Sequence, residues 1–98
     1  MYYETDKNPK ARLIRSMWAY VGSPATIIAP FGETDVNIEY VPAKHTAWLN
    51  FGGRLASVDA DSQDVIDAVY QELAQQCRLR LQEEMYRKFA EDELGFVP

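Results

Sequence analysis

The sequence is poor in residues that form disulfides and histidine-based sites, with one cysteine, Cys77, and one histidine, His45, among 98 residues. A single cysteine cannot form an intramolecular disulfide, which excludes the disulfide-stapled secreted scaffolds. A single histidine excludes metal sites built on a histidine pair. Residues 1–10 lack the apolar core of a signal peptide, and no apolar run approaches the length of about 18 residues that spans a membrane. We therefore expect a cytoplasmic protein with no membrane contact.

Basic charge is also scarce, because 10 Lys and Arg residues stand against 15 Asp and Glu residues and the net charge is −5. Proteins that bind nucleic acid by neutralising phosphates carry a clustered basic excess, so we expect no direct nucleic-acid binding. The charge is uneven: residues 1–31 carry +2, residues 32–64 carry −4 and residues 65–98 carry −3. This balance favours a protein partner with a basic or mixed surface.

Apolar residues are plentiful enough for one core, and the length predicts a single acidic domain over residues 1–98. A helix is predicted over about 9–21. Pro9 suits its first position, Gly22 suits a left-handed C-terminal cap, and Pro24 blocks continuation. Its apolar side chains follow helical spacing: Leu13, Ile14, Met17, Trp18 and Val21.

The central part of the chain has the short β-branched and aromatic runs, separated by turn residues, that are typical of strands. We expect three strands, over about 25–29, 35–41 and 46–58. Gly52-Gly53 interrupts the third of these, so it becomes two strands if the glycines form a hairpin turn. Core packing is the expected role of Trp18, Trp48 and Phe51.

A long C-terminal helix is predicted over about 62–93, with Asp61 or Ser62 as its N-cap. Such a helix is about 45 Å long, whereas a compact chain of this size is about 30 Å across, so its end should overhang, bend or meet a partner. The whole pattern predicts an α+β fold of order α-β-β-β-α. One row of apolar residues recurs every four positions along the helix. Four residues exceed one full turn by about 40°, so the row winds around the helix axis. Its members are Val65, Val69, Leu73, Cys77, Leu81, Met85 and Phe89.

Asp59, Asp61 and Asp64 are spaced closely enough to suggest a Mg²⁺ or Ca²⁺ site. They do not fit the calcium loop of an EF-hand, which would need glycine in place of Asp64 and glutamate in place of Tyr70. Capping of the helix, where acids complement the helix dipole, is the interpretation that we prefer. No catalytic constellation passes through His45 or Cys77, so we expect no enzyme activity, no cofactor and no metal.

The leading hypothesis is a small protein-binding module that blocks a basic, nucleic-acid-handling site on its partner with an acidic surface. The chain is similar in size and charge to the small inhibitors that bacteriophages encode. The first alternative is an assembly subunit that forms a homodimer through the C-terminal helix, and the second is a small metal-dependent enzyme using the acids between Asp59 and Asp64. The predicted partner-binding residues are Asp59, Asp61, Asp64, Glu83, Glu84, Met85, Tyr86 and Phe89.

Overall fold

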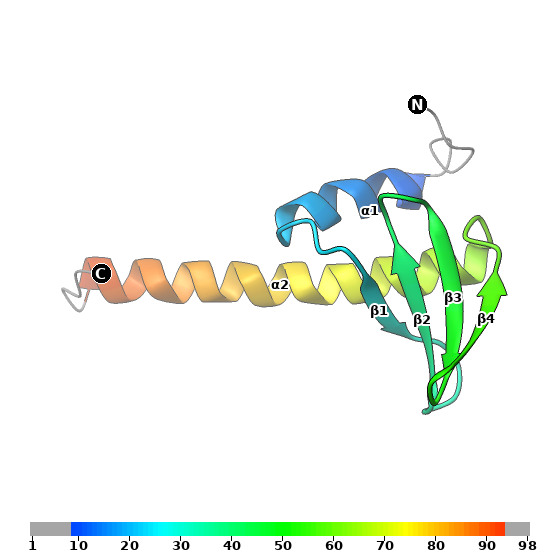
Figure 1. The fold of residues 1–98 in the computed structure, drawn as a ribbon. Helices are drawn as coiled ribbons and strands as arrows, with labels where there is room; N and C mark the ends of the chain where they lie inside the picture. Colours follow the sequence, from blue (N-terminus) through cyan, green and yellow to red (C-terminus); the bar gives the residue numbers. More distant parts are fainter. Residues whose placement is uncertain (1–8, 94–98) are drawn as a thin grey trace.

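A computed structural model describes residues 9–93 and has the predicted α+β fold (Figure 1). The order of elements is α-β-β-β-β-α, so the four-strand alternative is the one found. The elements are α1 (Pro9–Tyr20), β1 (Ile27–Pro30), β2 (Val36–Val41), β3 (Thr46–Phe51), β4 (Arg54–Val58) and α2 (Gln63–Glu93).

The predicted strand 46–58 is divided at Gly52-Gly53. Both glycines have positive φ, +59° and +99°, which a hairpin turn of type I′ requires and which glycine adopts without steric cost. Phe51 and Arg54 therefore face each other across the turn. The two-strand alternative for residues 46–58 is therefore the one found, because a positive φ at two successive residues reverses the chain.

The four strands form one antiparallel sheet in chain order. Its inner face carries Ile27, Tyr40 and Ala47 side by side, and α2 packs against β1 and β2 on that face. α1 packs along α2, so both helices and the sheet share one core (Figure 1). That core consists mainly of aliphatic residues from the sheet and the two helices: Ile14, Ile27, Ile38, Tyr40, Ala47, Ala60, Val65, Ile66, Val69 and Leu73.

The end of α1 confirms the predicted glycine cap. Gly22 has φ +99°, its N–H donates to the carbonyl of Ala19 at 3.2 Å, and the N–H of Ser23 donates to the carbonyl of Trp18 at 2.9 Å. These two bonds satisfy carbonyl groups that the helix end would otherwise leave without partners. The chain therefore leaves α1 at a fixed angle toward β1.

Two of the aromatic residues expected in the core lie elsewhere. Trp48 is half-buried on the outer face of the sheet, opposite Glu39 and Ser57. Phe51 is 46% exposed, because the β3–β4 hairpin turns away from α2 (Figure 1). Trp18 packs against the core from α1 and donates its indole N–H to the carbonyl of Pro24 at 2.6 Å.

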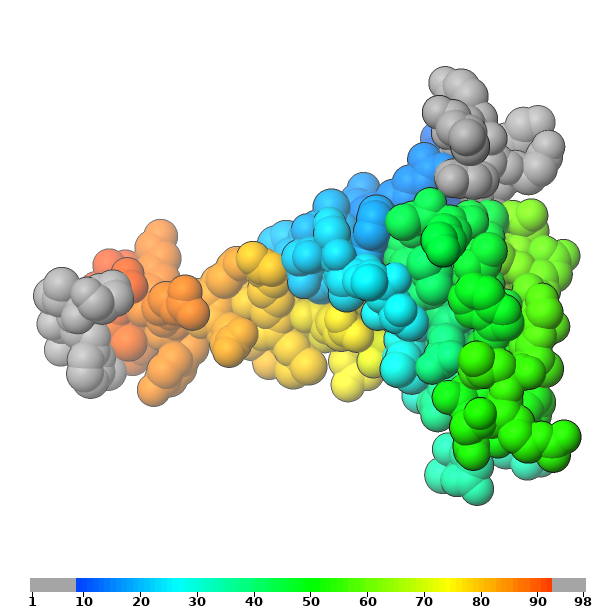
Figure 2. Space-filling model, in the orientation of Figure 1, coloured from blue at the N-terminus to red at the C-terminus, as the bar shows by residue number. Residues whose placement is uncertain are grey.

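Of the three outcomes expected for the end of α2, the structure has the overhang. The first half of α2 buries Val65, Val69 and Leu73, whereas the segment Arg78–Asp92 leaves the globule and is exposed at every residue except Ala90, which is half-buried (Figure 2). The molecule measures 50 × 33 × 19 Å and has a radius of gyration of 16.2 Å. A compact chain of this length has a radius near 13 Å, so the projecting helix accounts for the elongated shape.

Replacing Leu73 with alanine tests whether the globule depends on the first half of α2. Leu73 is fully buried, and we expect Leu73→Ala to lower the free energy of unfolding by about 2–5 kcal/mol. Leu79→Ala, the same change at a position 57% exposed on the same helix, should alter it by no more than about 0.5 kcal/mol. Urea denaturation followed by circular dichroism at low protein concentration measures both. Equal losses would contradict this division of the helix.

Candidate functional site

The predicted partner-binding residues fall into two separate places. Asp59, Asp61 and Asp64 lie in the β4–α2 loop and the first turn of α2, whereas Glu83 to Phe89 lie on the projecting part of the helix. Asp64 and Glu84 are about 30 Å apart along the helix axis, at 1.5 Å per residue. The structure therefore does not bring these residues together into one site.

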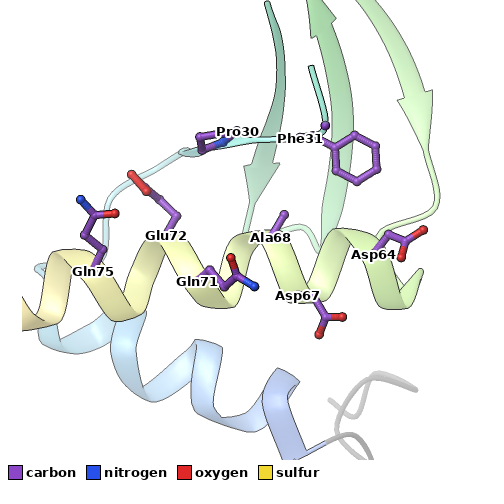
Figure 3. Close-up of a pocket in the computed structure, with 9 residues that line it drawn as sticks. Pro30, Phe31, Asp64, Asp67, Ala68, Gln71, Glu72 and Gln75 are labelled. Atoms are coloured by element: carbon purple, nitrogen blue, oxygen red, sulfur yellow. The ribbon is translucent and has the colours of Figure 1, made fainter. Parts of the chain in front are cut away.

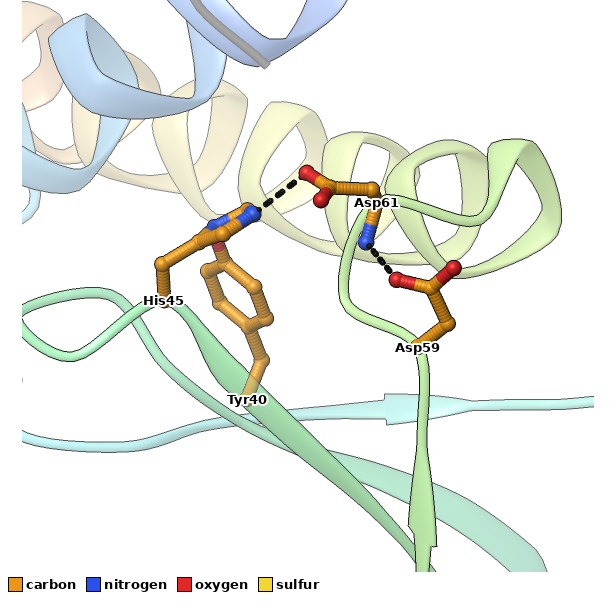
Figure 4. A network of polar contacts seen from close by, with 4 residues as sticks. All are labelled: Tyr40, His45, Asp59 and Asp61. Atoms are coloured by element: carbon orange, nitrogen blue, oxygen red, sulfur yellow. Dashed lines mark hydrogen bonds and ion pairs between the residues drawn. The ribbon is translucent and has the colours of Figure 1, made fainter. Parts of the chain in front are cut away.

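The loop acids bind groups within their own chain (Figure 4). Asp59 Oδ1 accepts the backbone N–H of Asp61 at 2.9 Å, and Asp61 Oδ1 lies 2.7 Å from Nε2 of His45. Ser62, one of the two predicted N-caps, directly precedes the first helical residue. Within residues 9–93, no three His, Cys, Asp or Glu side chains are placed to hold a metal ion. The loop acids thus order the entrance to α2.

His45 links three parts of the fold, a role that its position in a turn did not indicate. It has φ +50°, and its side chain is 12% exposed. Nδ1 lies 2.8 Å from the Tyr40 hydroxyl of β2, while Nε2 faces Asp61 before α2 (Figure 4). With the proton on Nε2, the imidazole donates to Asp61 and accepts from Tyr40. Sixteen residues separate His45 from Asp61, so no local spacing in the sequence signals the contact.

An open groove lies between the β1–β2 turn and α2 (Figure 3). Phe31 and Ala68 form its apolar part, and Asp64 and Glu72 lie along α2. Asp67 also borders the groove, but its carboxylate points toward α1, where Oδ1 accepts Lys10 Nζ at 2.7 Å and Gln63 Nε2 at 2.8 Å. The carboxylate of Asp67 is therefore engaged within the fold.

The distal segment, which we define as Arg78–Asp92 of α2, is balanced in charge although the whole chain is acidic. Tyr20 at the end of α1 donates to Glu84 Oε2 at 3.0 Å, and Arg80 Nε donates to Glu84 Oε1 at 3.2 Å. The bond from Tyr20, followed by that from Arg80, lowers the pKa of Glu84. The four positive and four negative residues of the segment are Arg78, Arg80, Arg87, Lys88, Glu83, Glu84, Glu91 and Asp92.

Large apolar side chains project from the distal segment into solvent. Met85 is 67% exposed, Tyr86 71% and Phe89 54%, and all three are predicted partner-binding residues. Leu79 and Leu81 are exposed to a similar degree and were missing from that prediction, although Leu81 belongs to the same row at intervals of four. The distal segment is thus the part of α2 whose large apolar side chains stay exposed within the described residues 9–93.

Comparisons with protein-family models, with curated proteins and with solved structures found no match for this chain. A search of the described residues for a helix able to cross a membrane found none of sufficient length and apolar character.

The Lys10–Asp67 pair makes stability depend on pH. The Asp67 carboxylate accepts hydrogen bonds from Lys10 and from Gln63. These bonds, that from Lys10 having the larger effect, lower the pKa of Asp67 below the ordinary value of 3.8. A depressed pKa in the folded state stabilises the fold above pH 3.8, and this contribution is lost as the pH falls through the folded-state pKa. We expect a double-mutant cycle of Lys10→Met and Asp67→Asn, measured by urea denaturation, to show favourable coupling at pH 7 that shrinks below pH 3.8. A coupling that stays constant with pH would contradict this assignment.

Proposed function

We propose that this chain is a non-enzymatic protein-binding module whose docking element is the distal segment of α2. The observation that carries the proposal is the exposed row of Leu81, Met85 and Phe89 on a regular helix that projects from the globule (Figure 2). Large apolar groups gathered on one exposed element are typical of surfaces that bind other proteins. The spacing of four residues suits a helix that lies against a partner helix or in a groove.

The needs of the globule do not account for the distal segment. The last fully buried residue of α2 is Leu73. Cys77, one turn further on, is only half-buried, with its thiol 3.8 Å from the Met17 carbonyl. Beyond it, the Arg80–Glu84 pair supports the helix locally, at a spacing where such pairs contribute a few tenths of a kcal/mol. If a partner buried Met85 and Phe89, the hydrophobic effect would stabilise the complex by about 25 cal/mol for each Å² of apolar surface removed from water.

The structure offers less support for electrostatic blocking of a basic site than for docking through apolar side chains. The distal segment carries no net charge, and the acids of the β4–α2 loop bind within the chain. An acidic inhibitor would act through the surface of the globule, and the proposed docking element does not depend on that surface. An assembly subunit, by contrast, would use the same segment to bind a second copy.

A paired substitution tests the docking element. We expect Met85→Glu combined with Phe89→Glu to remove the polypeptides that co-purify with the tagged full-length chain from its host, a second untagged copy included. The reason is that two carboxylates would have to be desolvated in the contact. Quantitative mass spectrometry of the captured material measures the loss.

Arg87→Gln combined with Lys88→Gln is the matched control. It changes the net charge by the same two units, but it leaves the apolar row intact on the same segment. Circular dichroism should show equal helix content in all three proteins. If the double glutamate variant and the control retain the same polypeptides as the unaltered chain, the distal segment is not the docking element.

A further inference from the structure

We propose that the partner of the distal segment is a second copy of this chain, lying antiparallel with Met85 at the two-fold axis. This inference rests on the proposed function, because it names the occupant of the same surface. It depends on the order of charged and apolar residues along one face of the helix.

The face centred on Met85 is symmetric in spacing and opposite in charge at its two ends. Going along α2, Arg78, Leu81, Met85, Phe89 and Asp92 follow one another at intervals of three, four, four and three residues. Seven residues make two turns to within about 20°, so Arg78 and Asp92 both lie on the face of Met85. Both are exposed.

Antiparallel pairing places complementary groups together along this entire face. Arg78 meets the partner's Asp92 at each end, and Leu81 meets the partner's Phe89 on either side of the central methionines. A contact of this kind is isologous, since each copy uses the same residues. Parallel pairing in register would instead set Arg78 against the partner's Arg78, and like charges oppose such an arrangement.

The geometry of the monomer leaves room for a second helix. Met85 lies about 160° around the helix from the buried Val69, so its side chain projects away from the globule. Tyr20 of α1 contacts Glu84, which belongs to the charged side of the segment rather than to the Met85 face. Arg78, Met85 and Asp92 are spaced by seven residues. This spacing keeps the same line of side chains facing a partner helix that crosses at a shallow angle.

The size of the contact indicates a weak dimer. The segment is about 22 Å long at 1.5 Å per residue, and one of its faces offers less than the roughly 800 Å² per partner of a standard interface. We expect a dissociation constant in the micromolar range. Sedimentation velocity of the purified full-length chain, from about 1 to 500 µM, should show conversion from monomer to dimer. A monomer throughout this range would overturn the inference while leaving the docking element open to a different protein.

Cross-linking determines the direction of the pairing. In a Cys77→Ser background, Met85→Cys should cross-link to itself with a short bismaleimide. Leu81→Cys should not self-link, because two copies of this position lie about 12 Å apart along the axis in an antiparallel pair. It should link to Phe89→Cys when the two variants are mixed. Efficient self-linking of Leu81→Cys would show a parallel pair and overturn the proposal.

Charge exchange tests the end contacts independently. Arg78→Asp and Asp92→Arg should each weaken self-association about fivefold or more, since an exposed ion pair is lost and a like-charge pair replaces it at both ends. The double variant Arg78→Asp/Asp92→Arg should dimerise as the unaltered chain does, because antiparallel pairing restores opposite charges. Failure of the double variant to recover, with unchanged helix content, would contradict the assigned pairing.

Discussion

The burial and exposure of α2 depend on one helical row, in which an apolar side chain recurs every four residues from Val65 to Phe89. An α-helix turns by about 100° per residue, so each step of four moves the row by about 40°. The early members, Val69 and Leu73, therefore face the sheet and α1 and are fully buried. The late members, Met85 and Phe89, face the other way and are exposed. The same row thus forms part of the core at one end of α2 and the proposed docking surface at the other.

The remaining contacts fix where that helix begins and how it leaves the globule. His45 and Asp61 join the β2–β3 turn to the start of α2, while Lys10 and Asp67 join its second turn to α1. Tyr20 reaches Glu84, near the middle of the distal segment. Side-chain contacts therefore hold the helix from its first turn as far as Glu84, and the part beyond continues as a regular extension of an anchored element. A rigid extension loses less conformational freedom on binding than a flexible tail would.

Much of this fold could be predicted from local features, because caps, turns and periodicity act over a few residues. The Gly22 cap, the division at Gly52-Gly53 and the overhang of α2 all follow from neighbouring positions. The His45–Asp61 contact could not be predicted, since it depends on how two loops meet in space. Phe51 and Trp48 show the same limit: the alternation of a strand says which residues share a face, but not how far the helices cover that face.

For the candidate site, the exposure of Met85, Tyr86 and Phe89 could be predicted because helix length and apolar spacing are local properties. The loop acids were grouped with these residues only by charge. The net charge of a chain does not say where the charges lie. This chain is acidic as a whole, yet its distal segment is neutral. Once the face around Met85 is isolated, the order of its charges matters more than their sum. A face with Arg78 at one end and Asp92 at the other is complementary to its own reversed copy, and this property separates self-association from attraction to any basic surface.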